Sequence, residues 1–174
     1  MVRGVCEPEE PGRPAPRFGT ELKAQDDMTK ARLKPLNQQA MVITGATSGI
    51  GLATARRGLT EELQAEGARA AYAVADVADY DALAEAAEKC RRLFGGFDTW
   101  VNNAGVSIYG PIRETTLEDQ RRLFETNYWG VVNGSLVAAE HLRERPDGGS
   151  IINVASILSD APIPVQGVYS ASKH

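Results

Sequence analysis

A tyrosine and a lysine, with a serine upstream of them, are the residues of this sequence best suited to proton transfer. Tyr169 and Lys173 are four residues apart, and Ser156 follows an apolar run. A spacing of four places two side chains on one face of a helix, where a lysine cation stabilises a tyrosinate. Such a phenol can exchange a proton with an oxygen while a hydride moves at the adjacent carbon. Ser156, at the end of a predicted strand, can reach the same oxygen.

A second group of residues is suited to holding phosphate. The apolar residues 40–43 lead into the run Thr-Gly-Ala-Thr-Ser-Gly-Ile-Gly at 44–51. Gly45 permits a sharp turn away from a strand, Gly49 lets the backbone approach a diphosphate, and Gly51 allows close packing of a helix on the strand. The first N–H groups of the helix then point at the phosphates. An ordinary strand-to-helix turn is the alternative; a P-loop is excluded because no Gly-Lys-Ser/Thr follows.

Strand and helix patterns alternate along the rest of the chain. Apolar runs predict strands at 40–44, 68–75, 98–101 and 150–155, and helical periodicity lies between them at 50–65, 79–94 and 116–144. Asp79 is a suitable N-cap for one helix, Thr115 and Thr116 both offer caps for the next, and Gly95-Gly96 is a suitable stop. The alternation predicts an α/β fold with a parallel sheet of about four strands and ligands at their carboxyl ends. We expect 68–75 to pair with the 40–44 strand; the competing arrangement keeps 68–75 apart from it and leaves a hole in the sheet with two unpaired edges.

Several motifs occur together at the positions that this architecture brings to one edge. The sequence resembles the short-chain dehydrogenase/reductase (SDR) family from about residue 38 to its last residue. The resemblance rests on 44–51, on Asn102-Asn103-Ala104-Gly105, on Asn127, and on Ser156 with Tyr169 and Lys173. It implies a Rossmann-like doubly wound parallel sheet and an NADP or NAD cofactor.

The resemblance also implies roles for individual residues. Tyr169 is the general acid/base, Ser156 hydrogen-bonds the substrate oxygen, Lys173 holds the nicotinamide ribose and tunes Tyr169, and Asn127 supports a proton relay through water. The implied cofactor-binding residues are Gly45, Thr47, Ser48, Gly49, Ile50, Gly51, Asp76, Val77, Asn103, Ala104, Gly105, Tyr169 and Lys173. Asp76 and Val77 would flank the adenine. Taken singly, these residues could instead be turn, cap or surface residues.

The sequence departs from the family pattern in two places. Between Gly51 and the 68–75 strand there is room for little more than one helix, so the family's second strand is missing. The end of that strand selects between NAD and NADP, and this preference is unreadable here. The chain also stops at His174, one residue after Lys173, so we expect an incomplete sheet and impaired family homo-oligomerisation.

Two functions from different classes fit these features. The first is an oxidoreductase that interconverts an alcohol and a carbonyl of a small molecule with NAD(P)(H). The alternative is a non-catalytic, truncated remnant that binds a dinucleotide. The catalytic residues favour the first function, and the missing segments favour the second.

Composition restricts the partners and the compartment. The net charge of −4 and the lack of basic patches argue against nucleic acid, and no apolar run is long enough for a membrane span. Two distant cysteines, Cys6 and Cys90, are typical of a cytoplasmic protein. Residues 1–37 are rich in proline, glycine and charge, which predicts a disordered tail before a domain at 38–174. We expect Cys90 in the core and His141 on a solvated surface.

Overall fold

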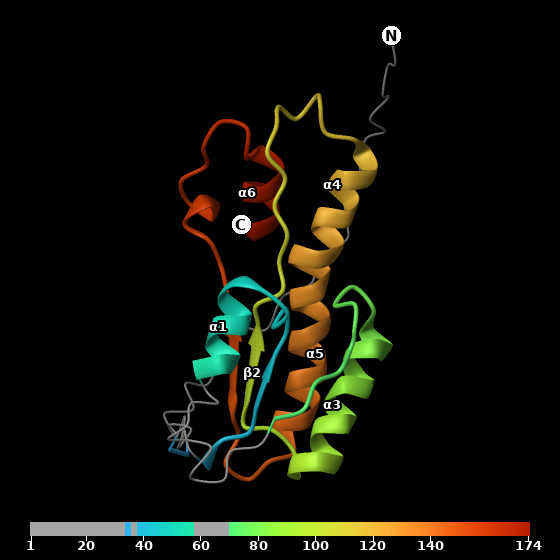
Figure 1. Cartoon of the computed structure of the whole chain (residues 1–174), viewed down its shortest axis with the longest axis vertical. Helices are drawn as coiled ribbons and strands as arrows, with labels where there is room; N and C mark the ends of the chain where they lie inside the picture. Colours follow the sequence, from blue (N-terminus) through green and yellow to red (C-terminus); the bar gives the residue numbers. More distant parts are fainter. Residues whose placement is uncertain (1–33, 36–37, 58–69) are drawn as a thin grey trace, which may run out of the picture. The chain divides into compact units, whose positions relative to one another are not determined.

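Three strands form a parallel sheet in the computed structural model, which describes residues 34–35, 38–57 and 70–174 (Figure 1). The elements, in chain order, are β1 (Met41–Ile43), α1 (Gly49–Arg57), α3 (Tyr80–Phe94), β2 (Thr99–Asn102), α4 (Leu117–Phe124), the π-helix η2 (Glu125–Trp129), α5 (Gly130–Arg143), β3 (Ser150–Asn153), the 3-10 helix η3 (Ile157–Ser159) and α6 (Gly167–Lys173). None of the helices in this part of the chain is long and apolar enough to cross a membrane.

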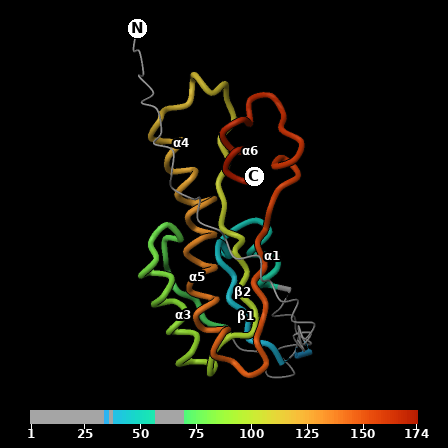
Figure 2. The backbone as a smooth tube through the Cα atoms, turned by 180° about the vertical axis from the view of Figure 1, so that it is seen from behind, coloured from blue at the N-terminus to red at the C-terminus, as the bar shows by residue number. Residues whose placement is uncertain are grey.

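The strand order is β1-β2-β3, and both pairings are parallel. Met41 pairs with Thr99, and Thr99 pairs in turn with Ser150. In both views, β1 and β2 lie between α1 on one side and α3 with α5 on the other (Figures 1 and 2). This parallel α/β arrangement confirms the predicted fold class. It also brings the segments that follow the three strands to one edge of the sheet.

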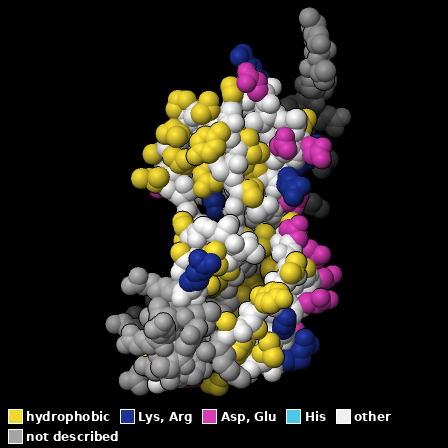
Figure 3. All heavy atoms as spheres, viewed as in Figure 1, with side chains coloured by type: hydrophobic (Ala, Val, Ile, Leu, Met, Phe, Trp, Pro, Cys, Tyr) yellow, Lys and Arg dark blue, Asp and Glu magenta, His cyan; other side chains and the backbone are white. Residues whose placement is uncertain are grey.

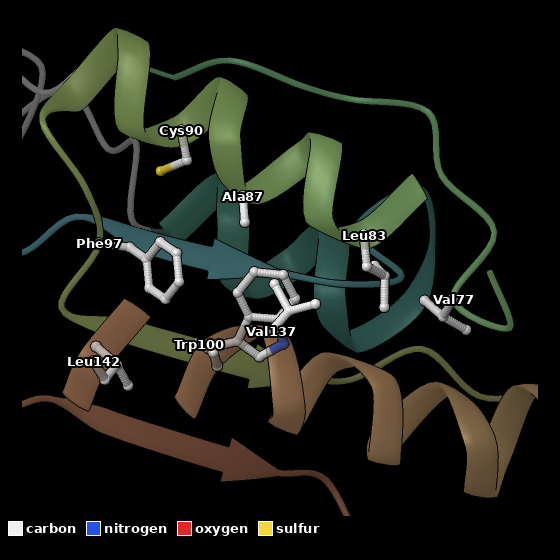
Figure 4. Close-up of a cluster of buried hydrophobic side chains, with 9 residues drawn as sticks. Val77, Leu83, Ala87, Cys90, Phe97, Trp100, Val137 and Leu142 are labelled. Carbon is white, nitrogen blue, oxygen red and sulfur yellow. The ribbon is translucent and has the colours of Figure 1, made fainter. Parts of the chain in front are cut away.

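The main core lies where α3 and α5 pack against β2 (Figure 4). Phe97 and Trp100 are fully buried, and their ring centroids are 5.3 Å apart. Aliphatic and small side chains from the two helices surround them: Leu83, Ala87, Cys90, Val137, Ala138 and Leu142. The prediction that Cys90 belongs to the core is therefore confirmed, and burial raises the pKa of its thiol.

The caps of α3 follow the prediction. The Asp79 carboxylate accepts hydrogen bonds from the N–H groups of Asp81 and Ala82, and Gly95 ends the helix in the left-handed conformation with φ of 79°. These caps satisfy backbone groups that a helix end otherwise leaves free. They fix the length of α3 and so the position at which β2 begins.

The helix predicted at 116–144 is interrupted by one wide turn. Thr116 caps α4 as expected, and its hydroxyl accepts from Asp119 N at 3.0 Å. The chain then forms the π-helix η2 before α5 begins at Gly130. A π-turn adds one residue to the helical repeat and often occurs at functional sites. Asn127, one of the predicted site residues, lies inside it.

A strand is predicted at 68–75, and the structure describes residues 70–75 of this range. Residues 70–75 form no strand, and the expected pairing with β1 is wrong because β1 pairs only with β2 among the described strands. The segment is held by α3 instead: Lys89 Nζ donates to Tyr72 O at 2.6 Å and lies 5.6 Å from the Tyr72 ring centroid. The tail predicted at 1–37, apart from Lys34 and Pro35, and the end of the helix predicted at 50–65 lie outside the described residues.

His141 also differs from expectation, because it is not a solvated surface residue. Its ring is partly buried and lies 4.1 Å, centroid to centroid, from Phe97, whose backbone N–H donates to His141 Nε2 at 3.1 Å. Burial and the nearby charges of Arg145 and Arg91 lower the pKa of His141. The periodicity of α5 did not reveal this contact because Phe97 is 44 residues away in the sequence.

Candidate active site

The glycine turn after β1 is fastened to the segment that follows β2. Thr44 Oγ1 accepts the N–H groups of Asn103 and Ala104 at 3.0 and 3.1 Å. In return, Asn103 Nδ2 donates to the carbonyl oxygens of Thr44 and Gly45 at 3.0 and 3.3 Å. Asn103 therefore holds together the two loops that the sequence assigned to cofactor binding.

Glycine is required in this turn for two different reasons. Gly45 and Gly49 have φ of 64° and 53°, which side-chain-bearing residues rarely adopt. A Cβ on Gly51 would collide with the Asn103 amide and with Gly45 O, whereas a Cβ on Gly49 would have no atom of another described residue within 4 Å, its two chain neighbours aside. Leu52 N donates to Ser48 O at 3.1 Å. The N–H groups that precede Leu52 at the start of α1 are thus directed out of the helix end.

Lys173 reaches the same edge of the sheet from α6. Its ammonium donates to Val154 O, just after β3, at 3.1 Å. A Cβ built on Gly105 would lie 3.5 Å from both Lys173 Nζ and Asn127 Oδ1. The structure therefore brings together Lys173, Asn127 and Gly105, which come from α6, η2 and the loop after β2.

The Asn127 side chain is buried, with 2% of its surface exposed, and its amide is fully engaged. Oδ1 accepts from Val106 N at 2.8 Å, and Nδ2 donates to Val106 O at 2.8 Å and to Ser172 Oγ at 2.9 Å. Both amide hydrogens are used in these contacts. Asn127 thus links the loop after β2 to α6, rather than bonding only to neighbours in its own helix.

Ser156 and Tyr169 lie on the two segments that follow β3. Ser156 is the N-cap of η3, and its Oγ accepts from Leu158 N at 3.2 Å. Tyr169 is partly buried in the middle of α6. No hydrogen bond joins these two side chains within the described residues.

Asp76 and Val77 lie just before α3. Asp76 is exposed, and its carboxylate accepts from Ala78 N at 3.0 Å, as in an Asx turn. Val77 is buried, and a Cβ on Gly130 would collide with it. Val77 therefore fixes the loop against the start of α5, and Asp76 presents its carboxylate to solvent.

Sequence reasoning missed four residues that join these segments. Ser172 accepts from Asn127, and Ser107 Oγ donates to Gln166 Oε1 at 3.2 Å; Val106 contributes only backbone groups. Their partners are 21 to 59 residues away in the sequence. A local pattern carries no signal for such contacts. Ser172 is adjacent to Lys173 in the sequence, but this does not indicate that its partner is Asn127.

Comparison with known proteins identifies the family. A family model described as "short chain dehydrogenase" matches residues 57–174. An uncharacterized oxidoreductase, YxnA, from Bacillus subtilis is 40% identical over 164 residues, which cover 83% of this chain and 46% of that protein. The chain belongs to the short-chain dehydrogenase family, and it spans about half the length of this relative.

Solved structures show the same similarity in three dimensions. A short-chain dehydrogenase/reductase from Burkholderia phymatum in complex with NAD has a TM-score of 0.74 at 29% identity, over 82% of this chain and 57% of the other. A short-chain dehydrogenase from Burkholderia cenocepacia in complex with NADP has a TM-score of 0.70 at 30% identity, over 80% of this chain and 64% of the other. The neighbours thus include complexes with both dinucleotides.

Proposed function

We propose that this chain forms the cofactor-binding and catalytic part of an oxidoreductase that interconverts an alcohol and a carbonyl with NADP or NAD. The observation that carries the proposal is the convergence of Lys173, Asn127 and Gly105 at the sheet edge that also holds the glycine turn. A cation, an engaged amide and a residue without a side chain meet there. This arrangement suits a cofactor that must lie flat against the backbone beside a proton donor.

The glycine turn fits a dinucleotide. The open space that the described residues leave around a Cβ at Gly49, and the N–H groups at the start of α1, make a suitable cradle for a diphosphate. Thr47, Ser48 and Ile50 lie in the same turn, Asn103, Ala104 and Gly105 would support the nicotinamide half, and Asp76 and Val77 would flank the adenine. When bound, the nicotinamide ring supplies the hydride donor or acceptor.

Tyr169 is the proposed general acid/base, and Lys173 stabilises its anionic form and holds the ribose. Ser156 Oγ accepts from Leu158 N, so its hydroxyl hydrogen remains available to donate to the substrate oxygen. Asn127 uses its side chain for Val106 and Ser172. Its contribution to a proton relay would therefore come from its backbone carbonyl.

The surroundings of the proposed site favour an apolar substrate. Apolar side chains gather over α6 and the loops beside it (Figure 3). Among them Ile157, Ile163 and Val165 are exposed at 79%, 49% and 48%. A small molecule that carries its alcohol or carbonyl on an apolar skeleton would bury this surface.

The wider setting of the enzyme is part of the same proposal. A domain at 38–174 preceded by a separate tail and a cytoplasmic location fit the composition. The family resemblance implies a homo-oligomer, which we expect to be impaired in this chain. The exposure of Leu117 and Leu136, at 68% and 53%, is compatible with subunit contacts along α4 and α5. The charge of −4 gives no support to nucleic acid or a membrane surface as a partner.

Turnover of apolar alcohols and ketones tests the function. We expect oxidation of NAD(P)H in the presence of such ketones, and a loss of kcat of at least about a hundredfold in Tyr169→Phe. Dinucleotide affinity should fall much less than kcat in that variant, because phenylalanine keeps the ring and the other cofactor-binding residues remain. Binding of NAD(P)H without turnover would support the non-catalytic alternative, and turnover that survives Tyr169→Phe would contradict the assignment of the acid/base.

A further inference from the structure

The two-residue segment Val106-Ser107, which continues from the cofactor loop, is attached to both ends of α6. At the start of α6, Ser107 Oγ donates to Gln166 Oε1 at 3.2 Å. At its end, Asn127 bridges Val106 to Ser172, with bonds of 2.8 Å to Val106 O and 2.9 Å to Ser172 Oγ. Tyr169 lies midway between the two attachment points.

Both attachment points are buried inside the protein. Gln166 and Ser172 are exposed at only 1% and 6%, and Ser172 Oγ also donates to Tyr169 O at 2.8 Å. The bond from Asn127 to Ser172 is buried, so its loss would leave a polar group that water does not reach, whereas the bond from the exposed Ser107 to Gln166 is only partly buried. The backbone adds a third link, since Gly110 N donates to Val165 O at 2.9 Å. Val165, which precedes Gln166, has a φ of 62°, a value that β-branched residues rarely adopt.

We propose that Ser172 and Gln166 are positioning residues, which hold the Tyr169 hydroxyl and the Lys173 ammonium in register with the cofactor loop through Val106 and Ser107. This proposal rests on the proposed oxidoreductase function. In the proposed reaction, neither the Ser172 side chain nor the Gln166 side chain contacts a reacting atom. Ser172 acts through Asn127, and Gln166 acts through Ser107, so that α6 cannot rotate or slide relative to the loop that carries Gly105.

The chain supplies a matched control on the same helix. Ser170 is as buried as Ser172, at 6% exposure each, but its Oγ has no hydrogen-bond partner among the residues that the structure describes. Ser172→Ala removes a hydroxyl that is hydrogen-bonded to Asn127 and Tyr169. Ser170→Ala removes a hydroxyl of the same size without such bonds in the described part of the chain. Ser107→Ala removes the hydrogen bond to Gln166 at the start of α6. Because Ser107 is exposed, this variant should still fold.

We expect Ser172→Ala to lower kcat at least about tenfold, because small displacements of reacting groups are costly, while the KM for NAD(P)H changes less than about twofold. Ser107→Ala should lower kcat by about threefold to tenfold, and Ser170→Ala should stay within about twofold of wild type. Ser172→Ala and Asn127→Ala should combine less than multiplicatively, because the two residues act as one unit.

Amide hydrogen exchange provides a readout that needs no turnover. Ser172→Ala should speed exchange in α6 by about tenfold, with Ser170→Ala unchanged. Equal kcat and equal exchange in the two variants would overturn the inference, as would multiplicative effects of Ser172→Ala and Asn127→Ala. Turnover that survives Tyr169→Phe would instead overturn the proposed function. In that case, faster exchange in Ser172→Ala than in Ser170→Ala would still show that Ser172 fixes α6.

Discussion

Asn102 Nδ2 donates to Asn153 Oδ1 at 2.8 Å, which joins the last residues of β2 and β3 through their side chains as well as their backbones. The same Asn102 amide donates to Ser135 Oγ at 3.1 Å on α5 and accepts from Trp100 Nε1 at 2.7 Å. Three elements thus meet at one buried amide, directly before the loop that carries Asn103 and Gly105. Asn102 therefore fixes the ends of β2 and β3, from which the loops of the candidate site begin.

Asn102→Ala should therefore lower the free energy of unfolding by about 2–4 kcal/mol, because it leaves the Trp100 N–H buried without an acceptor and opens a cavity. Asn153→Ala removes one of these bonds from an exposed residue and should cost about 1 kcal/mol. Urea denaturation of the two variants measures the difference. Equal losses would show that the Trp100 contact contributes nothing.

Two glycines offer a second comparison. A Cβ on Gly134 in α5 would collide with Asn102 Oδ1 and lie 2.9 Å from Trp100 Nε1. A Cβ on Gly167, the first residue of α6, would have no atom of another described residue within 4 Å, its two chain neighbours aside. Gly134→Ala should destabilise the fold by about 1–3 kcal/mol through overpacking. Gly167→Ala should stabilise it by about 0.5 kcal/mol, because it lowers the entropy of the unfolded chain. Thermal unfolding midpoints that shift in the same direction for both variants would contradict this reading.

Much of the fold was predictable where local signals and tertiary packing agree. The caps at Asp79 and Thr116 and the Gly95 stop were read correctly, because capping depends on residues within three or four positions. The glycine turn was predictable for the same reason. Lys173 was placed at the sheet edge by its motif, although its contact with Val154 O was not foreseen.

The rest depends on contacts that the sequence does not display. Residues 70–75 have strand-like composition, but Lys89 binds the Tyr72 carbonyl and the segment stays outside the sheet. Likewise, the apolar periodicity of 116–144 fits a continuous helix and does not predict the π-turn that contains Asn127. Residues 70–74 are exposed and 70–75 lie outside the sheet although their composition favours a strand, and apolar periodicity does not encode the one-residue change of register in the π-turn.

The glycine turn leads to a third prediction. Gly51→Ala places a methyl group against the Asn103 amide and Gly45 O, so the turn must separate from the loop after β2. We expect NAD(P)H affinity to fall at least about tenfold and the free energy of unfolding to fall by about 1–3 kcal/mol. Ala53 lies on the exposed side of α1, and Ala53→Ser is the control, which should keep affinity within about twofold. Calorimetric titration with NADPH and NADH checks both variants, and wild-type affinity in Gly51→Ala would show that the turn does not hold the dinucleotide.

The last prediction concerns pH and the partly buried His141. Burial and the charges of Arg145 and Arg91 lower its pKa in the folded state, and they outweigh the opposing effects of the Phe97 carbonyl oxygen, 3.1 Å from Nε2, and of Glu144. The unfolded chain, with a pKa near 6.5, then binds a proton before the folded chain does as the pH falls. The His141 contribution to stability is therefore fully present above pH 6.5, is lost as the pH falls through that value, and levels off below the folded pKa.

His141→Gln isolates this contribution, since glutamine keeps an acceptor for the Phe97 N–H but does not titrate. We expect the variant to be less stable by about 1 kcal/mol near neutral pH, because it loses the ring contact with Phe97. The difference between wild type and variant should shrink as the pH falls from about 8 to about 5. Urea denaturation at several pH values measures it. A difference that stays constant over this range would show that the ring remains in the same protonation state in the folded and unfolded chains.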